Sequence, residues 1–432
     1  MNYNDYEENL PQKNNRKKLI ATLVILSILA ICVIVLINLN NPTDPYVPDG
    51  EVSDVTMIYN AEDFLLLNNP EGGKFRLAND IDFSAVSTWE PFDFCGVLDG
   101  NGYALVNIRF PNLIKQNSGT IQNLKINGLS VPNDYTYTYE TFVGLVRDNT
   151  GIISDCTISG ASLSFATNIG FFAGYNSGVI EDCAVINTTI NSGAANGGGI
   201  AMDNYTEGSI RRCYTELSIT TYALSFGGIV GRNDGTLYTC YSRCSIKAEV
   251  YKYGAGTSIN ATAQVGGIAA YNDAKISECY AVLSLEASTS ANNTAPTAGM
   301  LGTSATSTVY AGGIAGINHG EIASSFTSVN LFTNVDGYDK GGDLTLNNYT
   351  GYLHGYCKTE YSSGVLTNCY YAQEDVIVAQ KQDKSVSYNQ DGNKTETSKL
   401  YQKEFCVGTL GWNETDWSFA GHGSYPTLKS KK

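Results

Sequence analysis

Short runs of alternating apolar and polar residues, separated by turn residues, fill the chain from about residue 56 onward. A typical run is GIISDCTIS (151–159). Such alternation has the period of a β-strand, in which successive side chains point to opposite faces. Gly-Gly and Asn-Asp-Gly sequences lie between the runs, and these residues tolerate the positive φ angles of tight turns. The pattern predicts many short strands.

The runs belong to a repeated unit that is marked by one Asn and one Cys. The unit GGIVGRNDGTLYTCYS (227–242) is followed by GGIAAYNDAKISECYA (266–281) and GGIAGINHGEIASSFT (312–327). In four copies the Cys follows the Asn by seven residues, in one copy by nine, and in another Ser325 takes the place of the Cys. The aligned asparagines are Asn149, Asn176, Asn204, Asn233, Asn272 and Asn318. The aligned cysteines are Cys156, Cys183, Cys213, Cys240 and Cys279, with Cys369 further along.

The spacing of the repeat predicts a solenoid. Successive aligned asparagines are 27, 28, 29, 39 and 46 residues apart, and internal periods of roughly 20 to 50 residues are typical of repeat folds. The shortest unit fits one coil of a parallel β-helix with three short strands, and stacked coils lie about 4.8 Å apart. We therefore expect roughly nine or ten coils, with Ile over Ile inside, Asn over Asn at a corner and Cys over Cys.

Both ends of such a stack expose strand edges, which need covering. NAEDFLLLNN (60–69) begins with a candidate N-cap, Asn60, and continues with acidic residues and an apolar stripe, so it predicts a short capping helix. SKLYQKEFCVGTLG (398–411) predicts a second one that ends at Gly411. These limits divide the region into a solenoid over 56–396 and a C-terminal cap over 397–432.

The repeats resemble a known motif. GGIAGINHGEIASSFTSVNL (312–331) and the other copies resemble the GLUG motif of bacterial surface proteins, including some that lie beside IgA-specific metallopeptidases. The resemblance covers roughly residues 56–429, from the leading segment 60–110 to the final segment 397–429. It implies a right-handed parallel β-helix at a bacterial cell surface. The family is defined by its architecture, so the resemblance implies a fold and leaves the activity open.

The first 55 residues differ in character. LIATLVILSILAICVIVLINL (19–39) has 21 residues without a charge, and a helix of that length covers roughly 30 Å, the thickness of one bilayer core. Lys and Arg precede this run, whereas Asp44 and Asp49 follow it. The positive-inside rule thus predicts a cytoplasmic tail over 1–18, a transmembrane helix over 19–39 and an extracellular, proline-containing spacer over 40–55. A cleaved signal peptide and a lipoprotein site in LAIC (29–32) are the alternatives; no small-residue cleavage motif supports either.

Composition narrows the classes of function. The 42 acidic against 27 basic residues give a net charge of −15, which argues against a nucleic-acid partner. The chain has no H-E-x-x-H, G-x-S-x-G or P-loop sequence, and its three histidines, His319, His354 and His422, are isolated. We therefore predict no catalytic, metal or cofactor site, and we expect the membrane and a surface glycan or protein as partners.

The two ladders have structural interpretations. Because Ser325 occupies one Cys position, the Cys ladder is interpreted as a column of small, buried side chains. Disulfides between stacked neighbours are an alternative, and zinc binding is a weaker one because no C-x-x-C occurs. Cys95, Cys244, Cys357 and Cys406 lie outside the ladder. The Asn ladder is expected to hydrogen-bond along the stack.

A charged column precedes the cysteines. If each Cys points inward, Asp155 and Asp182 point outward, and Arg212, Thr239 and Glu278 continue the column. Two carboxylates about 5 Å apart have the spacing found in retaining glycosidases, and they could also bind calcium. We interpret the column instead as a solvated face in which Arg212 relieves the repulsion between the acids.

Three units carry insertions at the same phase of the repeat, over 247–265, 286–311 and 332–350. Such insertions emerge from one side of a solenoid, so we expect loops that form a ridge. Tyr251, Tyr253, Tyr310 and Tyr338 are the candidate ligand-binding residues, although the loops could equally be without function.

Together these features predict a single-pass protein of the bacterial cell membrane with its N-terminus in the cytoplasm and its solenoid outside. Its predicted role is non-enzymatic, as an adhesin or a ligand-binding or display module. The alternative is a polysaccharide-active lyase or hydrolase, because β-helices also serve as enzymes and the fold does not decide between these functions.

Overall fold

The computed structural model describes residues 54–131, 141–164, 168–192, 196–222, 225–294, 303–340, 343–356, 364–382, 384–386, 388–421 and 423–430. The predicted cytoplasmic tail, the predicted transmembrane helix and most of the spacer lie outside these residues. Within them, no helix has the length and apolar character needed to cross a bilayer.

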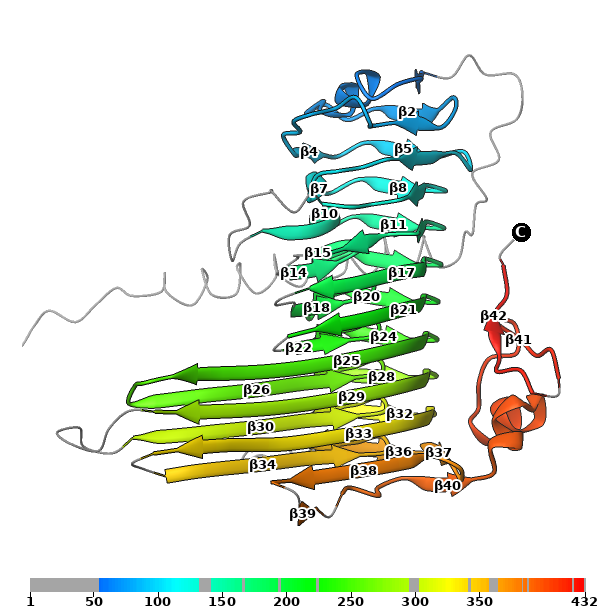
Figure 1. Cartoon of the computed structure of the whole chain (residues 1–432). Coiled ribbons are helices and arrows are strands. Elements are labelled where there is room, and N and C mark those ends of the chain that lie inside the picture. The colour runs from blue at the N-terminus through cyan, green and yellow to red at the C-terminus, as the bar shows by residue number, and fades with distance from the viewer. Residues whose placement is uncertain are drawn as a thin grey trace, which may run out of the picture. The chain divides into compact units, whose positions relative to one another are not determined.

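The strands of successive coils pair in parallel and in register, forming three large sheets (Figure 1). Sheet A has 11 strands, from β1 (Val55–Ile58) to β36 (Val365–Thr367). Sheet B has 14 strands, and its main path runs from β3 (Ile81–Asp82) to β40 (Asn393–Thr395). This arrangement confirms the prediction of an all-β fold of stacked parallel coils.

The third sheet has 15 strands in two rows that share β10 (Phe142–Asn149). Row C runs from β4 (Phe92–Phe94) through β7 (Asn112–Asn117) and β10 to β35 (His354–Tyr356). Row D runs from β10 to β34 (Asp343–Gly351). From β14 (Asn168–Gly170) onward the two rows are consecutive in the chain, so each of these coils contributes one strand to each row.

One coil passes through the sheets in a fixed order. It runs along β22 (Ser225–Gly227) in row D, β23 (Val230–Asn233) in row C, β24 (Thr236–Tyr238) in sheet A and β25 (Tyr241–Gly254) in sheet B. The coil thus has four strands where the sequence predicted three. The extra bend lies at the Gly-Gly pair, where a Cβ on Gly227 would come within 2.0 Å of the carbonyl oxygen of Val230.

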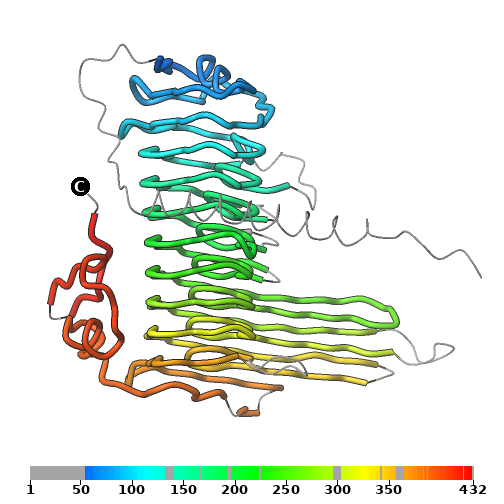
Figure 2. Tube along the Cα trace, turned by 180° about the vertical axis from the view of Figure 1, so that it is seen from behind, coloured from blue at the N-terminus to red at the C-terminus, as the bar shows by residue number. Residues whose placement is uncertain are grey.

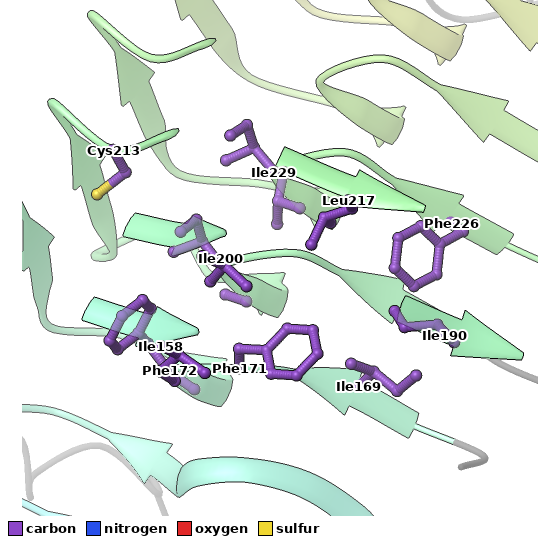
Figure 3. Packing of buried hydrophobic residues seen from close by; sticks show 14 of the residues in the cluster. Ile158, Ile169, Phe171, Phe172, Ile190, Ile200, Cys213, Leu217, Phe226 and Ile229 are labelled. Atoms are coloured by element: carbon purple, nitrogen blue, oxygen red, sulfur yellow. The ribbon is translucent and has the colours of Figure 1, made fainter. Parts of the chain in front are cut away.

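Ladders of apolar side chains fill the interior. Figure 3 shows Phe172, Ile200 and Ile229, which occupy the same bend in three successive coils and are all buried. The central residue of most sheet A strands is likewise apolar and buried, as in Phe75, Leu98, Ile121, Ile153, Ile180, Ile210, Leu237, Ile276 and Ile322. Burying one such side chain contributes roughly 1.5–3 kcal/mol, so these ladders are a main source of stability.

The corner between sheets A and B has a left-handed residue in every coil from Asn123 to Asn368. The φ angles lie between 48° and 55° at Asn123, Asp155, Asp182, Arg212, Thr239, Glu278, Ser324 and Asn368. This conformation is unfavourable for residues other than Gly, most of all for the β-branched Thr239. The predicted charged column therefore consists of corner residues.

The residue after each corner points inward, and at this position the structure places the Cys ladder. The Sγ of Cys240 donates to the carbonyl oxygen of Tyr238 at 3.3 Å, two residues before it. Cys156, Cys183, Cys213, Cys279 and Cys369 make the same contact. The hydroxyl of Ser325 donates to Ala323 in the same way at 2.7 Å. The corner thus favours a small side chain that carries one donor.

The described cysteines are free thiols. Burial raises the pKa of Cys183, Cys213 and Cys240 well above the usual range. These ladder thiols therefore stay protonated and remain hydrogen-bond donors. Three described cysteines lie outside the ladder: Cys244 and Cys406 are buried, and Cys95 is exposed. Cys357 lies outside the described residues.

A short helical turn lies in the first coils. It is the 3-10 helix η1 (Asp63–Leu67), and its Phe64 and Leu67 are buried. Asn60 caps it, because its Oδ1 accepts the backbone N–H groups of Glu62 and Asp63 at 2.9 Å each. The predicted N-terminal helix is therefore present, in the form of a single 3-10 segment.

The C-terminal segment lies along the side of the stack, where Figures 1 and 2 show it in red beside the coils. Its helices are the 3-10 helix η2 (Thr397–Tyr401) and the π-helix η3 (Glu404–Thr409). We call residues 397–430 the C-terminal strap. It was expected to cap the last coil, but its Trp412 and Trp417 pack instead against Tyr280 of sheet B, at ring-centroid distances of 6.2 and 5.8 Å.

The strap docks on the corner column. Asn368 donates to the carbonyl oxygen of Thr409 at 2.7 Å, and Ser324 accepts the indole N–H of Trp412 at 2.6 Å. Arg212 forms ion pairs with Asp182 in the preceding coil and with Asp416 of the strap. The side chain of Arg212 is only 6% exposed. The expected solvated face is therefore wrong at Arg212, because the strap covers it.

The ladder contact predicts how substitutions at Cys240 behave. Cys240→Ser keeps a donor to the Tyr238 carbonyl, so it should lower the free energy of unfolding by only about 1–2 kcal/mol. Cys240→Val removes the donor and adds a branched side chain, so it should cost more. Urea unfolding followed by circular dichroism measures both. An equal or larger loss for Cys240→Ser, or a disulfide at Cys240 in thiol counting on the denatured, unreduced chain, would contradict this account.

Candidate functional site

The three insertions form strands, not the expected loops. They prolong β25, β29 (Tyr280–Asn293) and β33 (Phe326–Asp339) in sheet B. They also prolong β26 (Ser258–Gly266), β30 (Ser304–Gly312) and β34 in row D. Figures 1 and 2 show these strands projecting together to one side of the coils as two facing layers, which we call the two-layer extension.

Small side chains fill the space between the two layers. Ala248, Ala261, Ala287 and Ala305 are fully buried, and Val250 is nearly so. They alternate with polar residues, as in NATAQV (260–265) and SATSTV (304–309). This alternation is a strand signal. These segments were expected to be loops because they are insertions at one phase of the repeat.

The candidate ligand-binding tyrosines do not come together. Tyr251, Tyr253 and Tyr338 are 58%, 79% and 51% exposed on the sheet B layer of the extension. Tyr310 lies on the row D layer, where its ring stacks on Tyr349 with centroids 5.1 Å apart. The four residues therefore belong to two different surfaces.

The Asn ladder runs through the row C corner and includes one residue that the repeat alignment missed, Asn117. Each Nδ2 donates to the Oδ1 of the Asn in the next coil, over distances of 2.7–2.9 Å. The ladder comprises Asn117, Asn149, Asn176, Asn204, Asn233, Asn272 and Asn318, all of them buried. These side chains hold the stack and are not available to a ligand.

Most of the residues on either side of the ladder are exposed or half-buried instead. Those before it form a column in register across row C, namely Asp148, Tyr175, Asp203, Arg232, Tyr271, Ile317 and Tyr356. Asp234, Asp273 and His319 follow the ladder asparagines of three successive coils. Because the ladder asparagine points inward, its neighbours are presented on the outside in most coils.

A groove with a volume of about 430 Å³ lies where this column meets row D. Its row C wall contains Met202, Asp203, Gly231, Arg232 and Tyr271. Its row D wall contains Asn168, Asn196, Gly197, Ser225 and Gln264. We call it the C–D groove. Because each wall draws on successive coils, the groove runs along the axis of the stack.

Arg232 is the centre of a charged network in this groove. Its Nε lies 2.9 Å from both carboxylate oxygens of Asp234, and its Nη2 lies 2.7 Å from Asp273. The guanidinium carbon is 4.9 Å from the ring centroid of Tyr271. These contacts fix the guanidinium group and neutralise its charge.

His319 extends the network into the next coil. Its Nδ1 lies 2.7 Å from the Tyr271 hydroxyl and 3.3 Å from Asp273. Its Nε2 is buried and has no hydrogen-bond partner among the described residues. Arg232, Asp273, Tyr271 and His319 therefore form one connected group of polar side chains over three coils.

Asp203 is the carboxyl group of the groove that has no fixed partner. Within the described residues it forms no hydrogen bond and no ion pair. Burial raises its pKa to about 6, an effect that Arg232 opposes and Asp234 reinforces. Near neutral pH the group therefore exists partly as a carboxylic acid, which can donate as well as accept a hydrogen bond.

A second, larger cavity of about 600 Å³ lies between sheet B and the strap, and it is lined in part by Arg243, Asp375, Tyr401 and Tyr425. Burial raises the pKa of Asp375 to about 7. Its two oxygens, however, accept the backbone N–H groups of Val329 at 2.9 Å and Ala372 at 3.2 Å. Asp375 thus stabilises the chain locally, and we favour the C–D groove as the functional site.

The other candidates give no site. Asp182 is paired with Arg212, and His354 is only 1% exposed, whereas His422 lies outside the described residues. In the part of the chain that the structure describes, no group of three or more Cys, His, Asp or Glu residues is placed to hold a metal ion. Asp203, Arg232, Tyr271 and Asp273 were not among the predicted site residues, although each directly flanks a ladder Asn.

Comparisons with known proteins do not assign a family. No family model matches the chain, and no curated protein matches it. One similar solved structure is that of a Bacteroides ovatus protein that has been suggested to be an immunoglobulin A1 protease. The two chains are 17% identical with a TM-score of 0.40, and the match covers 87% of this chain and 92% of the other.

The raised pKa of Asp203 predicts a specific dependence of stability on pH. The folded-state pKa is about 6 and the ordinary value is 3.8, so between these values the folded state binds more protons than the unfolded state. The contribution of Asp203 to stability is therefore present below pH 3.8 and lost as the pH rises through about 6. Asp203→Asn should remove this part of the decrease in the free energy of unfolding between about pH 4 and pH 6.

Urea unfolding of the wild type and of Asp203→Asn between about pH 4 and pH 8 measures the difference. Asp343→Asn, which changes an exposed carboxyl group at the start of β34, is the matched control. If the stability of Asp203→Asn falls with pH as steeply as that of the wild type, the Asp203 carboxyl group is not buried as described.

Proposed function

We propose that this chain is a non-enzymatic ligand-binding protein of a bacterial cell surface. In this proposal residues 19–39 anchor it in the membrane with the N-terminus in the cytoplasm, and a GLUG-like, right-handed solenoid displays the C–D groove outside. The uncharged run of 21 residues with its basic flank supports the anchor. The resemblance of the repeats to the GLUG motif supports the surface location and the handedness.

The observation that carries the proposal is the C–D groove with its fixed network. Arg232 is held by Asp234 and Asp273, and Tyr271 is held by Arg232 and His319. Side chains that are fixed before a ligand arrives lose little conformational entropy on binding. A groove of this size that brings several polar side chains together with an aromatic ring is suited to bind a polar ligand.

A second candidate function is polysaccharide cleavage, and one observation favours it. Asp203 has a pKa of about 6, raised by burial, and a carboxyl group of this kind is suited to act as a general acid. In a glycosidase it would protonate the departing glycosidic oxygen. The neighbouring carboxylates, Asp234 and Asp273, are engaged by Arg232, which makes binding the better supported function.

The test compares ligand binding with product formation. The full-length chain, kept in detergent, is applied to an array of glycans and of surface proteins, and the same preparation is incubated with soluble polysaccharides. We expect retention on the array without new reducing ends or unsaturated products. Arg232→Ala should weaken the retention at least about tenfold, because a fixed charged group at an interface contributes of that order.

Arg147→Ala is the control, since Arg147 is a half-exposed arginine of row C outside the groove. Cleavage products that disappear in Asp203→Asn would establish the enzymatic function instead. Retention that Arg232→Ala and Arg147→Ala leave equally strong would show that the C–D groove is not the binding site.

A further inference from the structure

Aromatic side chains continue the C–D groove toward the C-terminal coils. Gln264 of the groove wall is in register with Tyr310, and Tyr310 is in register with Tyr349. Tyr356 completes this group, with ring centroids 4.8 Å from Tyr349 and 5.5 Å from Tyr310. We call Tyr310, Tyr349 and Tyr356 the tyrosine platform. It lies two coils beyond Tyr271 in the same column, because Tyr271 pairs with Ile317 and Ile317 pairs with Tyr356.

A second aromatic pair lies at the opposite end of the groove. Tyr175 and Tyr205 stack with centroids 5.8 Å apart and an interplanar angle of 12°, and Tyr175 is in register with Asp203. From Tyr175 to Tyr356 the column crosses five steps between coils. At about 4.8 Å per step the column spans roughly 24 Å, and Ile317 within it is buried.

The chemistry of this surface fits a carbohydrate. In the pairs Tyr175–Tyr205 and Tyr310–Tyr349 one face of each ring is covered by its partner, so the remaining apolar ring surface and the phenol hydroxyl groups are what a sugar can contact. Asp203, Arg232, Gln264 and the groove asparagines supply donors and acceptors of the kind that hydroxyl groups need. Asp203 adds a carboxyl group that changes protonation state near pH 6, so it complements a hydroxyl group as donor or as acceptor.

The charges of the groove favour a neutral ligand. Arg232 is the positively charged residue of the groove lining, and it already forms ion pairs with two carboxylates, those of Asp234 and Asp273. Asp203 adds a further acid, and the whole chain carries a net charge of −15. A uronic acid, a sialic acid or a phosphate would therefore be repelled, because no positive group remains free to pair with it.

The direction of the groove favours a linear ligand. Asn168, Asn196, Ser225 and Gln264 come from four successive coils of row D, and Asp203, Arg232 and Tyr271 come from three successive coils of row C. The spacing between coils is close to the length of one sugar in an extended glycan. Equivalent side chains thus meet equivalent positions of a linear polymer, as in other solenoids that bind along their axis.

From these observations we infer that the ligand of the C–D groove is a neutral, linear glycan that lies along the axis of the stack, from the Tyr175–Tyr205 pair across Asp203, Arg232 and Tyr271 to the tyrosine platform. This inference rests on the proposed binding function and names its ligand class. About one sugar per coil corresponds to a segment of roughly six sugars.

The experiment measures how affinity depends on ligand length and charge. The full-length chain in detergent is titrated calorimetrically with the hexamers and trimers of β-1,4-linked glucose, xylose, mannose and N-acetylglucosamine. Hexamers of galacturonate and of glucosamine provide the anionic and cationic probes. We expect at least one neutral hexamer to bind at least about tenfold more tightly than its trimer, because only the hexamer reaches both the groove and the platform.

Two variants distinguish the contribution of the tyrosine platform from that of the C–D groove. Tyr349→Ala should weaken binding of the hexamer about five- to tenfold and leave the trimer unchanged, since the trimer is held in the groove; the loss is that expected for one aromatic contact. Tyr271→Ala should weaken both. Tyr253→Ala, which removes a ring that is 79% exposed on the other layer of the extension, is the control for both variants. Melting curves followed by circular dichroism confirm that each variant is folded.

The outcomes separate this inference from the proposed function. Tightest binding of the galacturonate or glucosamine hexamer would overturn the neutral ligand class. Equal affinities for hexamer and trimer, together with no effect of Tyr349→Ala, would overturn the axial arrangement. If no glycan binds but the chain still attaches to a surface protein in a manner that depends on Arg232, the ligand class is wrong while the binding function stands.

Discussion

The register between coils is the constraint on which the rest of the structure depends. It is held by backbone pairing in three sheets and, inside the row C corner, by an unbroken chain of amide hydrogen bonds from Asn117 to Asn318. Because side chains in a strand alternate, a slip by one residue would turn these buried amides outward and their neighbours inward. The same register therefore decides that Asp203, Arg232 and Tyr271 face the solvent and meet in one groove.

The register places strained backbone at the corner between sheets A and B, and neighbouring groups stabilise this corner. Eight successive coils place a residue other than Gly at a positive φ angle there, an arrangement that is unfavourable in each coil. In the coils from Asp155 onward, the thiol or hydroxyl group that follows the corner donates to the carbonyl group before it, as at Cys240 and Ser325. Outside, the strap contacts the same corners at Asn368, Ser324 and Arg212. One column of strained residues thus serves as the docking line for the C-terminal strap.

The sequence contained enough information to predict the stack because the signals of a solenoid are local and repeated. The Asn and Cys positions could be aligned by eye, and they lie in the ladders of the structure. Sheet A has 11 strands where nine or ten coils were expected, and Asn117 was missed because the first coils lack the full Asn–Cys repeat. The two-layer extension was missed because its segments were expected to be loops inserted at one phase of the repeat, and only pairing with neighbouring coils makes them strands.

The candidate site and the strap were harder to predict for a different reason. Arg212 contacts Asp416, which lies 204 residues away in the sequence. No local sequence pattern predicts a contact over such a separation. In the C–D groove the residue types vary from coil to coil, with Asp203, Arg232 and Tyr271 at one repeat position. Periodicity identifies positions that stay the same, whereas a binding site is made of those that differ. The flanks of the ladder asparagines were the available signal.

The central claim is that the Asn ladder couples neighbouring coils, and a double-mutant cycle on Asn204 and Asn233 tests it most directly. Their side chains share one hydrogen bond of 2.9 Å. Urea unfolding should show a loss of about 1–3 kcal/mol for Asn204→Ala and for Asn233→Ala. The double variant should lose about 0.5–3 kcal/mol less than the sum of the two single losses. Losses that add to within about 0.3 kcal/mol would mean that the two amides are energetically independent and that the ladder does not hold the register.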